Sequence, residues 1–157
     1  MSTAELTVLQ GNEFLALEAR LIALLKGAVA GQQPAVHVLS AADLADVKSG
    51  NQRVPAIHVI YGGYAIAEDQ GTRLLLEHTW HVITVVRHVG ATRSGEKARA
   101  QMGPLLALAM STLLGVSVDG ATRPLKLTTP PKPWQDAGTQ YVPSSFIAQT
   151  IFHKTPN

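Results

Sequence analysis

The longest alternating pattern in the chain lies at residues 74–88, which read LLLEHTWHVITVVRH. Successive side chains of a strand point to opposite faces, so His78 and Trp80 share one face and His81 the other. β-Branched and aromatic residues dominate this run, and Gly and Pro are absent, which predicts a strand. Its fifteen residues, at about 3.3 Å each, span roughly 50 Å, whereas a compact chain of this size is about 40 Å across. We therefore expect the strand to bend, or to project beyond its own globule and join subunits.

Two segments place apolar residues three and four positions apart, which is the spacing of a helix with one buried face. The first segment spans 14–29, and Asn12 is placed to cap its start. The second runs from about 95 to 114, and Pro104 inside it predicts a kink or a restart. The pattern therefore predicts two main helices, with one further helical turn at 41–47.

Shorter alternating or β-branched runs predict further strands, which Gly, Pro and polar residues separate. Gly62 and Gly63 are expected to end one of these strands, and an acidic turn is expected at 67–71. The segment 129–138 contains three prolines and is expected to be a loop. The strands are expected at 35–39, 54–61, 74–88, 125–128 and 141–153.

The order of these elements predicts an α+β fold in a single domain of residues 1–157, with residues 1–11 as a flexible arm or a preliminary turn. Neighbouring strands form hairpins, so we expect a mostly antiparallel sheet of about four to five strands with two helices packed on one face. Two helices cover only one face of such a sheet. The other face, or an edge, would therefore remain for a partner.

The composition favours a surface that is buried against another molecule. Apolar residues make up 46% of the chain and charged residues only 15%. A monomer usually carries more charge to cover its surface. The alternative is a small, well-packed monomer whose surface is rich in Ser, Thr and Gln.

The charge is unevenly distributed along the chain. Residues 1–86 carry five basic and eight acidic side chains, whereas residues 87–157 carry eight basic and three acidic ones. Such asymmetry is typical of an assembly with one acidic and one basic face. The basic residues are scattered and few aromatic residues lie among them, which disfavours direct binding to nucleic acid.

The chain has no cysteine, which excludes disulfide bonds, thiolate metal sites and a cysteine nucleophile. Its first residues lack the basic start and apolar core of a secretory signal. The apolar stretch 21–30 is too short to cross a bilayer and contains Lys26. We therefore expect a protein without membrane contact that is made in a cytoplasm.

No segment matches a catalytic motif. Residues 90–97 read GATRSGEK, and Glu96 stands where a phosphate-binding loop needs lysine. We interpret this segment as the flexible, basic tip of a long arm that leads into the second helix. His78 and His81 have the spacing of a metal-binding pair on a helix, but on a strand they point to opposite faces. The sequence therefore predicts no catalytic residue, no metal and no cofactor.

Four segments follow one another in a recognisable order. They are the helix 14–29, the strand VPAIHVIY at 54–61, the strand 80–87 that feeds a helix through a turn rich in Gly and Arg, and the closing strand 141–152. In this pattern and order the chain resembles the phage tail terminator-like proteins, which complete the tails of long-tailed phages and prophages. The four segments cover nearly the whole chain, and the proline-rich segment 130–134 has no counterpart in the resemblance.

The resemblance implies a structural virion protein without enzymatic activity. It would be assembled in the cytoplasm of the bacterial host and belong to the virion tail. Its copies would form a ring, commonly of six, that caps the end of the tail tube, ends tube polymerisation and presents a surface for attaching the head. Its partners would be further copies of the chain, the tail tube protein and head–tail connector proteins, and DNA would pass through the ring lumen without sequence-specific contacts.

Within such a ring we expect basic residues to meet an acidic partner, and the tryptophan among the prolines to contact another subunit. Charge complementarity at such an interface steers and orients the partners more than it adds affinity. The expected interface residues are Arg87, Arg93, Lys97, Arg99 and Trp134.

Two alternatives stay open at this point. A head–tail joining protein or another minor tail protein shares the same architecture. A small metal-dependent enzyme would have to use the polar residues at the start of the long strand, namely Asp69, Glu77, His78 and His81.

Overall fold

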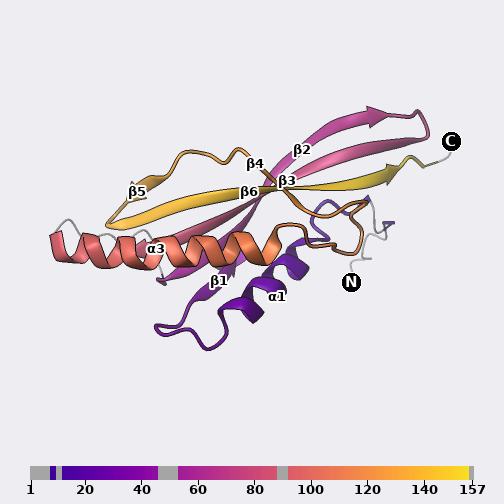
Figure 1. Ribbon diagram of the computed structural model, residues 1–157. Coiled ribbons are helices and arrows are strands. Elements are labelled where there is room, and N and C mark those ends of the chain that lie inside the picture. Colours follow the sequence, from indigo (N-terminus) through magenta and orange to yellow (C-terminus); the bar gives the residue numbers. More distant parts are fainter. Residues whose placement is uncertain (1–7, 10–11, 46–52, 88–91, 156–157) are drawn as a thin grey trace, which may run out of the picture.

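The computed structural model describes residues 8–9, 12–45, 53–87 and 92–155, and for 92–99 it describes the backbone alone. These residues form a long twisted sheet with helices on one side (Figure 1). The elements in chain order are α1 (Glu18–Val29), β1 (His37–Ser40), α2 (Ala41–Leu44), β2 (Ala56–Asp69), β3 (Arg73–Arg87), α3 (Thr92–Leu113), β4 (Lys126–Thr128), β5 (Trp134–Asp136) and β6 (Thr139–His153).

The sheet has six strands in the order β1-β2-β3-β6-β4, and β5 also pairs with β6. β1 is parallel to β2, and the other pairs are antiparallel. β3 and β6 pair along their whole length, from Arg73 opposite His153 to Arg87 opposite Thr139. The predicted α+β class, the mostly antiparallel sheet and the pairing of the two long strands are confirmed.

α1 and α3 pack against the same face of the sheet, as predicted (Figure 1). The core between them holds Leu25 of α1, Leu113 of α3, Trp80 of β3 and Phe146 of β6, all of which are fully buried. Trp80 and Phe146 lie opposite each other in the register of the two long strands. We call this face the helix side of the sheet, and the other face the open side.

The distal part of β2 and β3 and the end of β6 project beyond the helices as a three-stranded ribbon (Figure 1). The ribbon ends at the turn between β2 and β3, where the N–H of Gln70 donates to the carbonyl of Arg73 at 2.9 Å. The sequence pattern predicted the excess length of the strand but placed the tip of the arm at 90–97. That prediction is wrong, because residues 92–97 already belong to α3 at the opposite end of the sheet, while residues 88–91 lie outside the described part.

Gly62 and Gly63 do not end β2, contrary to the prediction. The strand runs through them to Asp69, and its register against β3 shifts between Tyr61 and Tyr64, as in a β-bulge. A Cβ atom on Gly62 would lie 2.4 Å from Nε2 of His81, and Gly63 has a φ of +98°. The two glycines therefore permit a close approach and a bulge within one continuous strand.

Gly62→Ala is expected to lower the free energy of unfolding by about 1–3 kcal/mol, because the new methyl group overlaps the imidazole of His81. The matched control is Gly27→Ala on α1, where a Cβ atom meets nothing within 4 Å and the change should add about 0.5–1 kcal/mol of stability. Urea unfolding of both variants measures these differences. A Gly62→Ala variant as stable as the parent would contradict the packing at the bulge.

Asn12 does not cap the first helix, contrary to the prediction. Its side-chain N–H donates to the carbonyl of His153 at 2.8 Å, and its Oδ1 accepts from the N–H of the same residue at 2.7 Å. The helix itself begins later, at Glu18, without a side-chain cap. Asn12 instead ties the start of the chain to the end of β6.

Pro104 neither kinks α3 into separate helices nor restarts it. The helix continues from Thr92 to Leu113 because buried residues on both sides of the proline, Met102 and Leu105, hold it against the sheet. The segment 129–138 is also not wholly a loop, since β5 pairs with the start of β6 within it. The strand lies beyond the prolines, where backbone N–H groups are again free to pair.

Candidate assembly surfaces

The predicted interface residues gather at the end of the sheet where α3 begins. Arg87 is the last residue of β3; it is exposed and lies opposite Thr139 at the start of β6. On the other side of β6, Asp136 of β5 lies opposite the same threonine. The first turns of α3 contribute the backbone positions of three further basic residues, whose side chains lie outside the described part: Arg93, Lys97 and Arg99. We call this end of the sheet the basic end.

Trp134 combines a fixed ring with an exposed surface. It is the first residue of β5 and is 42% exposed. Its ring stacks on Tyr141 of β6, with the centroids 5.0 Å apart and the planes 6° from parallel. Tyr141 in turn packs with Ile83 and Val85 in an apolar cluster on the open side. Such an anchored but accessible aromatic ring is typical of protein interfaces.

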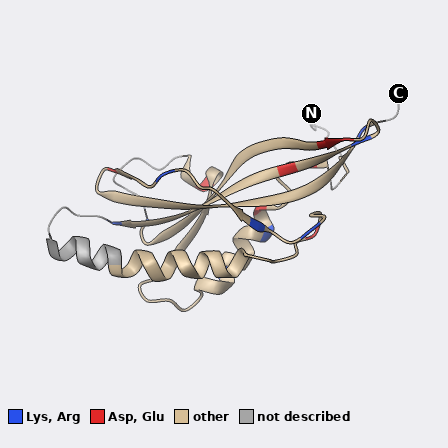
Figure 2. Cartoon of the chain, turned by 45° about the horizontal axis from the view of Figure 1, so that its top comes forward, with Lys and Arg blue, Asp and Glu red and all other residues tan. Residues whose placement is uncertain are grey.

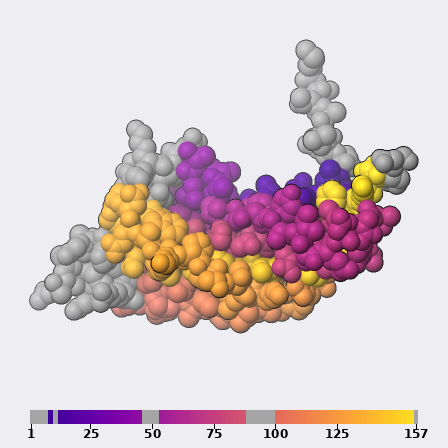
Figure 3. Space-filling view, turned by 90° about the horizontal axis from the view of Figure 1, so that it is seen from above, coloured from indigo at the N-terminus to yellow at the C-terminus, as the bar shows by residue number. Residues whose placement is uncertain are grey.

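The ribbon tip forms the opposite end of the molecule, and its β2 strand is acidic and apolar. Glu68 and Asp69 are exposed at the end of β2, and Arg73 follows across the turn (Figure 2). Tyr64 and Ile66 are 55% and 58% exposed. Figure 3 shows the ribbon at one end of an elongated molecule, with the segment around β5 towards the other end. Sequence reasoning missed this surface because it ended β2 before reaching it.

His78 and His81 lie on opposite sides of the sheet, as predicted, and each is hydrogen-bonded within the fold. Nδ1 of His78 lies 2.7 Å from the Tyr61 hydroxyl, and its Nε2 lies 2.9 Å from Oγ1 of Thr150. Nδ1 of His81 lies 2.7 Å from Oγ of Ser145. Burial lowers the pKa of both imidazoles. Among the described residues, no group of three or more His, Asp and Glu is arranged to hold a metal.

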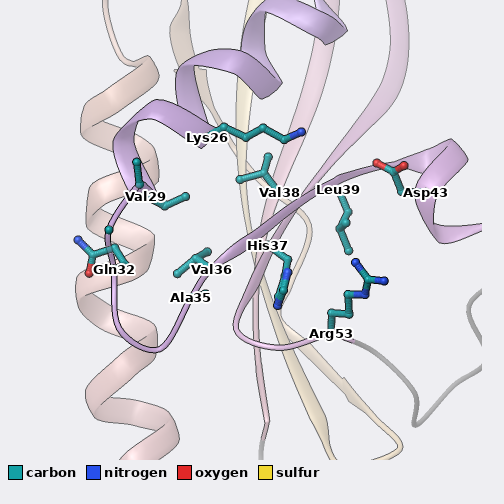
Figure 4. A pocket seen from close by; sticks show the side chains of 12 residues that line it. Lys26, Val29, Gln32, Ala35, Val36, His37, Val38, Leu39, Asp43 and Arg53 are labelled. Carbon is teal, nitrogen blue, oxygen red and sulfur yellow. The ribbon is translucent and has the colours of Figure 1, made fainter.

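An open hollow of about 470 Å³ lies beside β1 at the edge of the sheet (Figure 4). Lys26, Asp43 and Arg53 contribute its charged groups and come from α1, α2 and the segment before β2. The Asp43 carboxylate accepts hydrogen bonds from the N–H and the hydroxyl of Ser40, at 2.9 and 3.1 Å, and these bonds lower its pKa. Figure 4 shows Lys26, Asp43 and Arg53 at separate positions along the hollow.

The described residues thus form one long sheet, with the projecting ribbon at one end and the start of α3 at the other, and none of the described helices is long and apolar enough to cross a membrane. The family model described as phage tail terminator protein matches residues 11–156. The chain belongs to the phage tail terminator protein family. A comparison with curated protein sequences found no match.

Membership of the tail terminator family confirms the resemblance seen in the sequence. The family consists of structural, non-enzymatic virion proteins, and it implies that the chain caps the tail tube. This tail terminator is therefore a component of the phage tail that interacts with the tail tube. The alternative of a small metal-dependent enzyme is wrong, because the family is structural and because His78 and His81 are hydrogen-bonded on opposite sides of the sheet.

Proposed function

We propose that this terminator acts as a homo-oligomeric ring of six copies on the end of the tail tube. The ring ends tube polymerisation and presents the surface to which the head attaches. The family match, which spans nearly the whole chain, carries the proposal. Two features of the chain support it. The ribbon projects beyond the helices, where a neighbouring copy can contact it, and charged residues make up only 15% of the sequence, which favours a surface buried against another molecule.

In this ring the basic end contacts an acidic surface of the tail tube protein or of a head–tail connector protein. Arg87 and Trp134 lie on the two strands that flank the start of β6, so a partner at this end can contact both a cation and an aromatic ring. The positive charge at the start of α3 comes from Arg93, Lys97 and Arg99. Charge of this kind steers docking and sets its orientation. DNA passes through the lumen without sequence-specific contacts, and the ring is assembled in the cytoplasm of the bacterial host.

Light scattering of the purified protein, alone and mixed with tail tube protein, tests the ring. A particle several times the mass of one chain is expected, at least in the mixture. Arg87→Glu is expected to weaken binding to the tube protein about fivefold, because it reverses the charge at the basic end. Arg20→Glu reverses an exposed charge on α1 and should leave binding unchanged. A monomer at every concentration, also in the presence of tube protein, would contradict the ring.

A further inference from the structure

Along the ribbon, no strand of the described residues pairs with the outer edge of β2. β1 pairs with β2 only from Ala56 to Val59, and beyond Val59 no described strand lies on the side of β2 away from β3. Natural proteins usually protect such an edge with Lys, Pro or a covering element. Residues 60–69 contain no Lys, Arg or Pro, and only two bulges and the acidic residues at the strand end interrupt the edge. This stretch of backbone is therefore available for a further strand.

The exposed side chains beside this edge include the apolar Tyr64 and Ile66 on the helix side, with Asp69 at the strand end, and the acidic Glu68 on the open side. Tyr64 lies opposite His78 in the register, and Ile66 lies opposite Leu76, which places both exposed side chains on the helix side. Glu68 belongs to the open side after the second bulge, because it lies opposite Leu75.

β4 forms the opposite edge of the same sheet and carries the complementary pattern. Leu127 lies opposite Phe146 and is therefore on the helix side, where it is 37% exposed. Lys126 lies opposite Ile147 and is exposed on the open side. Each edge thus has an apolar group on the helix side, and the charges on the open side are opposite in sign.

The strand directions also permit the two edges to pair. β2 and β6 are both antiparallel to β3, and β4 is antiparallel to β6. β4 therefore runs in the opposite direction to β2. Rotation about an axis parallel to the strands does not change strand direction, so β4 of one copy runs antiparallel to β2 of the next copy. Within one sheet, Leu127 lies at the same height as Tyr61, because Leu127 pairs with Phe146, Phe146 with Trp80, and Trp80 with Tyr61. If the next copy is shifted by a few residues along the strands, Leu127 comes to lie beside Tyr64 or Ile66 of that copy. Closed sheets of tilted strands contain such a stagger.

We propose that β4 of one copy pairs with the free edge of β2 in the next copy, so that the sheets continue from subunit to subunit. This inference rests on the proposed ring and names the surface that builds it. The contact is heterologous, because it joins two different surfaces of the same chain, and repeated rotation closes it into a ring. Leu127 packs against Tyr64 and Ile66 of the neighbour, and Lys126 pairs with its Glu68.

Disulfide cross-linking tests this contact, and the absence of native cysteine makes it specific. The variants are Ile66→Cys with Leu127→Cys and Tyr64→Cys with Leu127→Cys, in the full chain assembled on tail tubes. Facing residues on neighbouring strands have the Cα separation that a disulfide needs. Oxidation is expected to give a ladder of covalent multimers with at least one pair. The control pairs Ile66→Cys with Leu114→Cys, which is 51% exposed at the end of α3, and should give no ladder.

A charge exchange tests the same contact without cysteine. Glu68→Lys and Lys126→Glu are each expected to lower the assembled fraction about threefold, and the double variant is expected to restore it. Circular dichroism of each variant checks folding. This contact would be overturned if rings form on tubes, neither cysteine pair gives a cross-link, and the double charge variant does not restore assembly. That result would leave the ring itself intact. Failure of the parent protein to assemble on tubes at all would overturn the ring and this contact together.

Discussion

Trp80→Ala is expected to lower the free energy of unfolding by about 3–5 kcal/mol, the largest effect of any single substitution considered for this chain. Trp80 is fully buried at the centre of the sheet, opposite Tyr61 on one side and Phe146 on the other. Its ring centroid lies 5.0 Å from that of Tyr61. Loss of the indole leaves a cavity between the long strands and the helices that the neighbouring backbone cannot fill.

Trp134→Ala provides the matched control, because it removes the same side chain from the surface. It should cost no more than about 1.5 kcal/mol, chiefly through the lost stacking on Tyr141. Trp80→Phe should cost less than Trp80→Ala, since the phenyl ring fills most of the cavity that alanine would leave. Neither variant leaves a polar group unpaired, because the indole Nε1 has no hydrogen-bond partner among the described residues. Urea unfolding gives all three values. Equal losses for Trp80→Ala and Trp134→Ala would contradict the placement of the core.

The titration of His58 alone is expected to lower the free energy of unfolding by about 3 kcal/mol as the pH falls from 6.5 to 4. Burial lowers the pKa of this imidazole to about 4, and its Nε2 has no hydrogen-bond partner among the described residues. Below pH 6.5 the imidazole binds a proton in the unfolded chain but stays neutral in the folded chain. The free energy of unfolding therefore falls as the pH drops, and it levels off below about pH 4, where both states are protonated. His78 and His81, whose pKa values burial also lowers, act in the same direction.

His58→Leu separates this contribution from general acid effects. Leucine removes a titrating group whose Nε2 has no hydrogen-bond partner in the described part of the chain, so the variant should lose less stability than the parent between pH 7.5 and pH 4. His153→Leu removes an exposed histidine at the end of β6 and tests whether loss of any histidine has the same effect. Urea unfolding at several pH values measures the difference. A His58→Leu variant with the parent's pH dependence would show that His58 does not resist protonation.

The sequence predicted the elements whose pattern depends on burial alone. The alternation around Trp80 and the helical spacing up to Leu113 both reflect one buried face, and both elements are present within a few residues of the expected bounds. Family membership also followed from the order of these elements. Periodicity carries such information because each element buries a continuous stripe of apolar side chains.

The sequence could not predict features that depend on a neighbour in space. Gly62 and Gly63 are typical of a strand end, and only the position of His81 across the ladder explains why glycine is needed inside β2. β5 escaped prediction because three residues after a proline-rich stretch show no pattern until β6 lies beside them. Tertiary pairing decides both cases.

The candidate surfaces were predictable only in part. Arg87 and Trp134 were expected at an interface from charge and composition, and the fold places them on the strands that flank the start of β6. Their role in binding stays a prediction. The free edge of β2 had no signal in the sequence, because Tyr64 and Ile66 alternate like any half-buried strand. Their exposure follows from the projection of the ribbon beyond the helices, and among the described strands none pairs with the outer edge of β2 beyond Val59.

The role of this protein as the cap of the tail tube is tested by the tail length of phage particles that lack it. Without it we expect tubes that grow beyond the normal length and carry no heads, because the ring that ends polymerisation and binds the head is absent. Electron microscopy of lysates from a deletion strain measures both features, and expression of the parent chain should restore tails of normal length. Tails of normal length without heads would contradict a role in ending tube polymerisation and would indicate a head–tail joining protein.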